Sequence, residues 1–140
     1  MENACILAID QGTSSTKTIV FDDEGNVVAK ATEMLKTFYT DGGFVEQDPE
    51  EIYTNVLASV KNCLAEFEKN CGKLTDIKTC GISNQRETFV IWDENGKPLY
   101  NAVVWQCKRS IGICKKLEQS WCAGKRFCQF IFWTIHCFYC

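Results

Sequence analysis

The sequence has one histidine in 140 residues and no excess of basic side chains. Its 15 lysines and arginines are outnumbered by 18 aspartates and glutamates, so the net charge is -3 at pH 7. This charge balance gives no basic footprint of the kind that binds nucleic acid or an anionic membrane, and we expect neither partner. Any binding of a phosphate must therefore come from a local group of residues.

Long apolar runs are also missing. The most apolar stretch, near the carboxyl end, is roughly half the length of about 20 residues that a membrane-spanning helix needs. Met1–Cys5 includes an acidic residue and does not resemble a secretory signal. We therefore expect a cytoplasmic protein whose ten cysteines are reduced thiols. For Cys63, Cys71 and Cys80 we expect a packing role.

The hydrophobic fraction of 46% and the charged fraction of 24% are typical of a globular domain. Short apolar runs separated by turn-forming residues predict an antiparallel meander, with strands at 6–9, 18–21 and 27–32. A polar loop through residues 40–43 leads to a predicted helix from Asp48 to about Gly72. Asp48 can cap this helix, Pro49 fits its first turn, and Glu51 stands at the capping-box position.

Further strands are predicted at 77–83, 88–92 and 101–105, with a turn at 93–96, followed by a second helix at 109–119. A meander, a crossover helix and further strands predict an α/β fold, in which a mixed sheet is covered by flanking helices.

The segment between the first two predicted strands, Asp-Gln-Gly-Thr-Ser-Ser-Thr-Lys at residues 10–17, is suited to hold phosphates. Gly12 lets backbone N–H groups approach an anionic oxygen closely. Three hydroxyl residues add donors, Lys17 can neutralise a phosphate, and Asp10 can hold Mg²⁺. The segment is not a Walker loop, because it lacks the second glycine before lysine and is followed by a strand. Taken alone, it also fits an ordinary hairpin turn.

Four blocks in order, residues 10–17, 43–49, 81–88 and 101–109, resemble the glycerol kinases of the FGGY carbohydrate kinase family. The resemblance runs from about Ile6 to about Gln119 and covers the first part of a much longer enzyme. It implies the ribonuclease H-like, actin-type ATPase fold, of which this chain would be an incomplete first domain at residues 1–120. It also implies ATP and Mg²⁺ as cofactors, glycerol as the small polyol substrate, and a homo-oligomer for the full-length family.

The resemblance also implies residue roles. Asp10 would face the metal, and Thr13, Ser14, Ser15 and Lys17 would face the phosphates of ATP. Lys17 replaces the arginine common in the family, keeping the charge while losing the bidentate fork, so weaker nucleotide binding is expected.

Arg86 and Glu87 would bind the polyol, because a guanidinium donates to hydroxyl oxygens and a carboxylate accepts from hydroxyl protons. Trp105 would lay its ring against the carbon chain of the substrate. Cys107 matches the glycerol kinase pattern, and we assign it no nucleophilic role.

The resemblance places the catalytic aspartate beyond the segment represented here. We therefore expect little or no kinase activity from this chain alone. Two alternatives are a kinase of another polyol or sugar, such as a pentulose, and a non-catalytic fragment that binds nucleotide or a partner.

The last twenty residues, 121–140, differ in composition, with no Asp or Glu, four cysteines and seven aromatic residues. We expect this tail to be sequence foreign to the family, produced by a frameshift or a truncated gene model. Family-like sequence in another reading frame just past the codon for Ser120 would support this, and its absence from all frames would contradict it.

Overall fold

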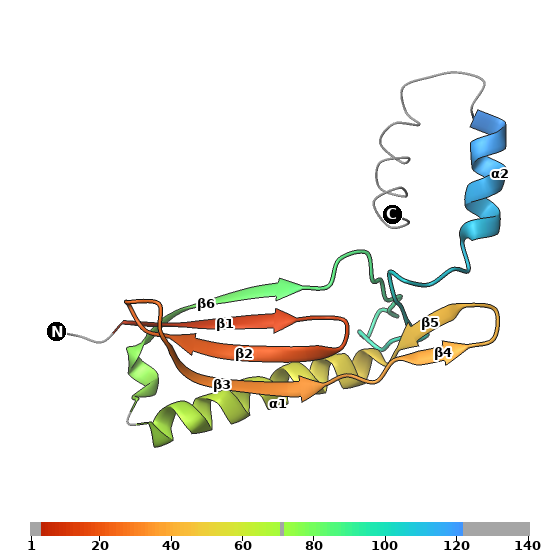
Figure 1. Ribbon diagram of the computed structural model, residues 1–140. Coiled ribbons are helices and arrows are strands. Elements are labelled where there is room, and N and C mark those ends of the chain that lie inside the picture. Colours follow the sequence, from red (N-terminus) through yellow and green to blue (C-terminus); the bar gives the residue numbers. More distant parts are fainter. Residues whose placement is uncertain (1–3, 71, 122–140) are drawn as a thin grey trace.

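The computed structural model describes residues 4–70 and 72–121 (Figure 1). Its elements are β1 (Cys5–Gln11), β2 (Ser15–Phe21), β3 (Val27–Met34), β4 (Phe38–Thr40), β5 (Phe44–Gln47), α1 (Pro49–Lys69), a 3₁₀ turn (Leu74–Asp76), β6 (Ile77–Asn84), β7 (Ala102–Val103) and α2 (Ile111–Trp121).

The larger sheet has the strand order β3-β2-β1-β6. The pairs β1–β2 and β2–β3 are antiparallel, which confirms the predicted meander, whereas β6 runs parallel to β1. The sheet is therefore mixed, as predicted. Because β1 and β6 are parallel, their carboxyl ends lie at the same edge, where the turn to β2 also lies (Figure 1).

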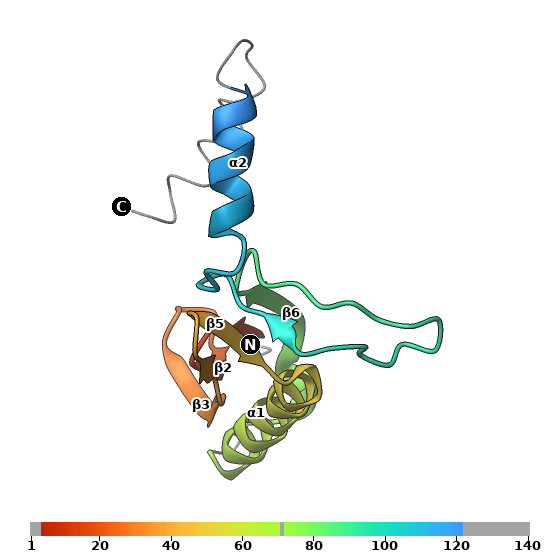
Figure 2. The ribbon, with the colours of Figure 1, turned by 90° about the vertical axis from the view of Figure 1, so that its right-hand side faces the viewer.

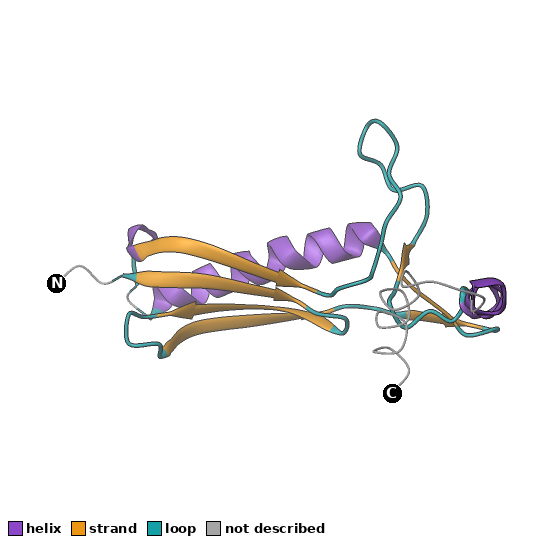
Figure 3. Ribbon diagram, turned by 90° about the horizontal axis from the view of Figure 1, so that it is seen from above, coloured by secondary structure: helices purple, strands orange, loops and turns teal. Residues whose placement is uncertain are grey.

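Helix α1 lies along one face of this sheet, against β2 and β3 (Figure 3). Asp48 caps it as predicted, since its carboxylate accepts from the Glu50 backbone N–H at 2.9 Å. The capping-box role expected for Glu51 is not observed. Its carboxylate instead accepts from the Lys36 backbone N–H at 3.2 Å, which ties the start of the helix to the chain that follows β3.

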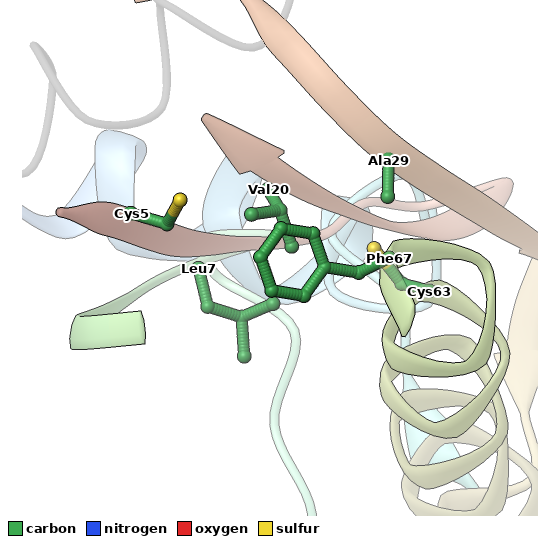
Figure 4. Packing of buried hydrophobic residues seen from close by; sticks show 6 residues of the cluster. All are labelled: Cys5, Leu7, Val20, Ala29, Cys63 and Phe67. Carbon is green, nitrogen blue, oxygen red and sulfur yellow. The ribbon is translucent and has the colours of Figure 1, made fainter. Parts of the chain in front are cut away.

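The core lies between α1 and the sheet. Phe67 projects from the helix toward side chains of three strands, with Cys63 beside it (Figure 4). A hydrogen bond also joins α1 to the sheet. The hydroxyl oxygens of Thr18 and Ser59 are 2.6 Å apart, and both residues are fully buried. The residues of the cluster are Cys5, Leu7, Val20, Ala29, Cys63 and Phe67.

A second sheet, in the order β4-β5-β7, lies beyond the end of the first. The polar loop predicted at 40–43 is the turn of the β4–β5 hairpin, and the two short strands on either side of it were not predicted. The strand predicted at 101–105 shrinks to Ala102–Val103. The strand predicted at 88–92 is also wrong, because only isolated bridges form there.

The physical reason is sparse pairing, because Phe89 bridges Val103 and Trp92 bridges Pro98 only as isolated pairs and no continuous ladder forms. Residues 85–101 form a loop that projects away from the sheets (Figure 2), and Phe89, Ile91 and Trp92 are exposed on it. Aromatic and β-branched residues favour a strand only where a partner strand or layer packs against them.

Helix α2 forms close to its predicted bounds but extends away from the larger sheet (Figures 1 and 2).

The packing role predicted for three cysteines is confirmed for the buried Cys63 and is wrong for Cys80, which is exposed on the edge strand β6. Cys71 and the tail residues 122–140 lie outside the described residues, so the expectations for them remain predictions. Among the described helices, none combines the length and apolar character needed to cross a bilayer.

Candidate functional site

The hydroxyl-rich turn joins the carboxyl end of β1 to the start of β2. The Gly12 N–H donates to the Ser15 carbonyl oxygen at 3.0 Å, and a Cβ built on Gly12 would lie 3.2 Å from that same oxygen. A side chain at this position would therefore press on the backbone that closes the turn. The Leu35 N–H donates to the Ser14 carbonyl oxygen at 2.9 Å, so the chain after β3 also holds the turn in place.

Asp10 and Lys17 are direct cross-strand partners on β1 and β2. Their neighbours Gln11, Thr16 and Thr18 are buried on the helix-covered face, so alternation places Asp10 and Lys17 on the opposite face, where both are exposed. Within the described residues they do not form an ion pair with each other. A cation site and an anion site can therefore lie side by side on this open face.

Thr13 connects the turn to distant parts of the chain. Its hydroxyl oxygen accepts from the Trp105 indole N–H at 3.0 Å. Its carbonyl oxygen accepts from the Gln47 side-chain amide at 2.7 Å. The structure thus brings together a residue predicted for the phosphates and a residue predicted for the polyol.

Arg86 and Glu87 follow the carboxyl end of β6 and are exposed. Glu87 has φ of 62°, and it is the only non-glycine residue with positive φ among the described residues. Such a backbone costs about 1–3 kcal/mol and persists only where the surroundings enforce it. The Gln85 N–H, which donates to the Gln11 carbonyl oxygen at 2.7 Å, fixes this segment beside the end of β1.

The sequence reasoning missed three residues that link these groups: Gln47, Gln85 and Thr88. Gln47 is fully buried, and its side-chain oxygen accepts from the Gln85 amide at 2.9 Å. The Thr88 hydroxyl donates to the Gln85 side-chain oxygen at 3.0 Å. The block at residues 43–49 and the block at 81–88 contain these residues, but nothing in their local pattern showed that they meet.

A second polar cluster, also missed, surrounds Glu46 on β5. Its carboxylate, 6% exposed, accepts from Arg109, Asn101 and Tyr100 and forms an ion pair with Arg109. The Arg109 guanidinium lies 4.6 Å from the centre of the Phe44 ring. These contacts attach the chain before α2 to the smaller sheet.

Cys107 belongs to the same cluster, and its sulfur accepts from Arg109 Nε at 2.9 Å. Burial raises the pKa of the Cys107 thiol, but N–H donors from the Arg109 and Val45 backbones and the Arg109 side chain outweigh it. The net pKa of the thiol therefore lies below its ordinary value.

The Glu46 carboxylate should make stability depend on pH. Hydrogen bonds from Arg109 and then Asn101 lower its pKa in the folded state despite burial, which raises it. The unfolded state binds the proton more tightly, so this stabilisation is present above the unfolded pKa of about 4.3 and is lost as pH falls through the folded pKa. We expect Glu46→Gln to lower the free energy of unfolding by about 1–3 kcal/mol at pH 7, and by less near pH 3.

Urea unfolding of the 140-residue chain and the variant between pH 7 and pH 3 measures this. Glu68→Gln, at an exposed position on α1, is the control and should be close to neutral throughout. A Glu46→Gln effect of constant size across that pH range would contradict the expectation.

The side chains available as ligands limit which kind of metal ion this site can bind. The described residues contain no group of three or more histidine, cysteine, aspartate or glutamate side chains that would hold an ion. The exposed Asp10 is a single carboxylate beside a turn rich in hydroxyls. This fits Mg²⁺, which keeps several waters and is commonly bound by one or two carboxylates together with substrate phosphates. It does not fit an ion caged entirely by protein side chains.

The meander, the crossover helix and the parallel fourth strand define an α/β domain of the ribonuclease H-like, actin-type ATPase class, as predicted. The chain belongs to the FGGY family of carbohydrate kinases, whose N-terminal domain matches residues 5–139.

Glycerol kinase 1 of Thermotoga maritima is 44% identical to this chain over 121 residues, which cover 86% of the chain and 24% of that relative. The glycerol kinase of Rhizobium meliloti is 46% identical over 115 residues, covering 81% of the chain and 22% of that relative. The chain therefore spans about a quarter of the length of the curated relatives it matches.

Solved structures of carbohydrate kinases have the same fold as this chain. The glycerol kinase of Plasmodium falciparum, crystallised with ADP, superposes with a TM-score of 0.78 at 36% identity, over 85% of this chain and 24% of that one. The gluconate kinase of Lactobacillus acidophilus superposes with a TM-score of 0.73 at 23% identity, over 84% of this chain and 23% of that one, and supports the fold alone.

Proposed function

We propose that this chain is the nucleotide- and polyol-binding first part of a kinase that transfers the γ-phosphoryl group of ATP to glycerol. The observation that carries the proposal is the hydrogen bond between Trp105 Nε1 and Thr13 Oγ1 at 3.0 Å. This bond joins a residue proposed to bind phosphate to a residue proposed to bind the polyol, and so supports two adjacent substrate sites. Phosphoryl transfer requires the two substrates to lie in line at short distance, and this arrangement supports it.

In this proposal the turn binds the phosphates. The side-chain hydroxyls of Thr13, Ser14 and Ser15 donate to phosphate oxygens, and Lys17 neutralises charge. Asp10 would hold Mg²⁺, which supplies charge neutralisation when it is bound with the nucleotide. Since the lysine donates as a point charge, it gives less directional binding than an arginine would.

The polyol would lie between the Arg86–Glu87 segment and the Trp105 ring. Within the described residues neither charged side chain has a protein partner, so both can turn to a ligand. The guanidinium donates to hydroxyl oxygens, the carboxylate accepts from hydroxyl protons, and the ring covers the carbon chain. A neutral triol satisfies these three groups together.

A chimeric enzyme tests the proposal. Residues 5–119 would replace the aligned segment of the Thermotoga maritima glycerol kinase 1, with the intact relative as the reference for activity. We expect ATP-dependent phosphorylation of glycerol in preference to xylulose or gluconate, and little activity from the 140-residue chain alone. Arg86→Ala in the chimera should raise KM for glycerol while leaving KM for ATP unchanged.

A chimera that is folded by circular dichroism but does not phosphorylate glycerol would contradict the proposal. Faster phosphorylation of the pentulose would favour the alternative of another sugar kinase.

The second alternative, a non-catalytic interaction fragment, rests on exposed apolar side chains. Ile82 on β6 is 67% exposed and Trp92 on the projecting loop is 51% exposed. Such side chains commonly mark a surface that another polypeptide covers. Size-exclusion chromatography together with a coupled kinase assay separates the two, because a defined, inactive oligomer would favour the interaction role.

A further inference from the structure

Five residues close a ring of hydrogen bonds around the candidate site. Starting from Thr13, the ring passes through the Gln47 and Gln85 side-chain amides to the Thr88 hydroxyl. The Thr88 oxygen accepts from the Trp105 backbone N–H at 3.3 Å, and the Trp105 indole returns to the Thr13 hydroxyl at 3.0 Å. The ring thus joins the hydroxyl-rich turn to both flanks of the Arg86–Glu87 segment.

Gln47 holds the central position in this ring. It is 0% exposed, and its Nε2 atom donates to the Thr13 carbonyl oxygen at 2.7 Å and to Thr37 Oγ1 at 2.9 Å. Its Oε1 atom accepts from Gln85. The amide therefore uses both donor hydrogens and its acceptor, which leaves one orientation that satisfies all its partners. Buried amides satisfied in this way specify a single local geometry.

Gln47 also has a fixed backbone. It stands at the end of β5, where it pairs with Ala102 of β7, one residue before the Asp48 cap of α1. The side chain extends from this junction toward the end of the larger sheet. A rigid element of the smaller sheet thereby sets the separation of two loops of the larger one.

We propose that Gln47 is a positioning residue that aligns the phosphate-binding turn with the polyol-binding segment. It touches neither ligand and acts through Thr13 and Gln85. This inference rests on the proposed function, because it assigns Gln47 to the alignment of the two substrates named there. The part of this inference that concerns structure, namely that Gln47 couples the two loops rigidly, can be measured without an activity assay.

The kinetic test uses Gln47→Leu, which removes all three hydrogen bonds, and Gln47→Glu, which keeps the size and the acceptor but loses both donors. In the chimera we expect kcat to fall about 10- to 100-fold with KM for ATP and glycerol nearly unchanged, because misplacement by about 1 Å can cost that much in rate. Ser59→Ala is the matched control. It removes a buried hydrogen bond in the core, away from both loops, and should lower thermal stability without changing kcat.

The second test uses the 140-residue chain itself. Amide hydrogen exchange at Gln85, whose N–H is bonded to the Gln11 carbonyl oxygen, should speed up in Gln47→Leu and remain unchanged in Ser59→Ala. Unchanged exchange at Gln85 in Gln47→Leu would overturn the positioning role, even if the unmodified chimera proves inactive. A kcat that falls no more in Gln47→Leu than in Ser59→Ala would also overturn it.

Discussion

Replacing Asp10 by alanine in the chimeric enzyme is expected to lower kcat by about 100- to 1,000-fold. The loss follows from the proposed role of the carboxylate, since charge stabilisation in a preorganised site contributes on this scale. Asp10 is exposed at the carboxyl end of β1 and pairs in register with Lys17. Its removal leaves the strand intact, so the folded structure should persist.

The measurement is steady-state kinetics at saturating glycerol over a range of magnesium concentrations. Asp10→Ala should require more magnesium for half-maximal rate, a signature that general damage to the fold would not produce. Asp23→Ala, an exposed aspartate in the turn between β2 and β3, is the matched control and should retain full activity. Full activity of Asp10→Ala together with Thr13→Ala would refute the assignment of the turn to the magnesium nucleotide.

Replacing Phe67 by alanine is expected to lower the free energy of unfolding by about 3–5 kcal/mol, because it removes a ring from a core that cannot fully collapse into the gap. Phe67 is 2% exposed and lies between α1 and the sheet (Figure 4). A Cβ built on Gly72 would lie 2.4 Å from this ring, so the chain after the helix folds tightly over it. Against a typical total stability of about 5–15 kcal/mol, the loss is large.

Urea unfolding of the 140-residue chain, followed by circular dichroism, measures the effect. Tyr53→Ala removes a ring of similar size from a 61% exposed position on the same helix and should cost less than about 0.5 kcal/mol. Gly72→Ala should destabilise the chain in the presence of Phe67 and cost less in the Phe67→Ala background, because the clash partner is gone. Should Phe67→Ala fail to fold, Phe67→Leu supplies the milder measurement, and an effect near zero in that variant would count against the packing.

Local patterns were sufficient for much of the fold. The meander was predicted because each strand is an apolar run bounded by turn residues, and α1 because Asp48 and Pro49 mark its start. Predictions failed where the outcome depended on a partner strand. Residues 88–92 have the composition of a strand, yet they lie on a projecting loop, whereas the short β4 and β5 pair with each other across a turn of glycines.

Part of the candidate site was likewise predicted from the sequence, and part was not. Asp10 and Lys17 were predicted because a carboxylate, hydroxyls and a cation on one turn suit phosphate binding. Arg86 and Glu87 were predicted because their block resembles that of the glycerol kinases, and all four roles remain predictions. Gln47 was not found, because a glutamine before a helix cap is unremarkable until its neighbours in space are known. Its importance comes from being fully buried with three hydrogen bonds.

The sequence by itself determined the family, the main strands and helix, and the side chains available for chemistry, since each of these depends on residues close together in the chain. Only the tertiary structure decided which of those side chains meet. The bond from Trp105 to Thr13 joins residues 92 positions apart, and the bond from Gln85 to Gln47 joins residues 38 apart. Such contacts are set by strand register and by the junction of two sheets, and no local periodicity encodes either.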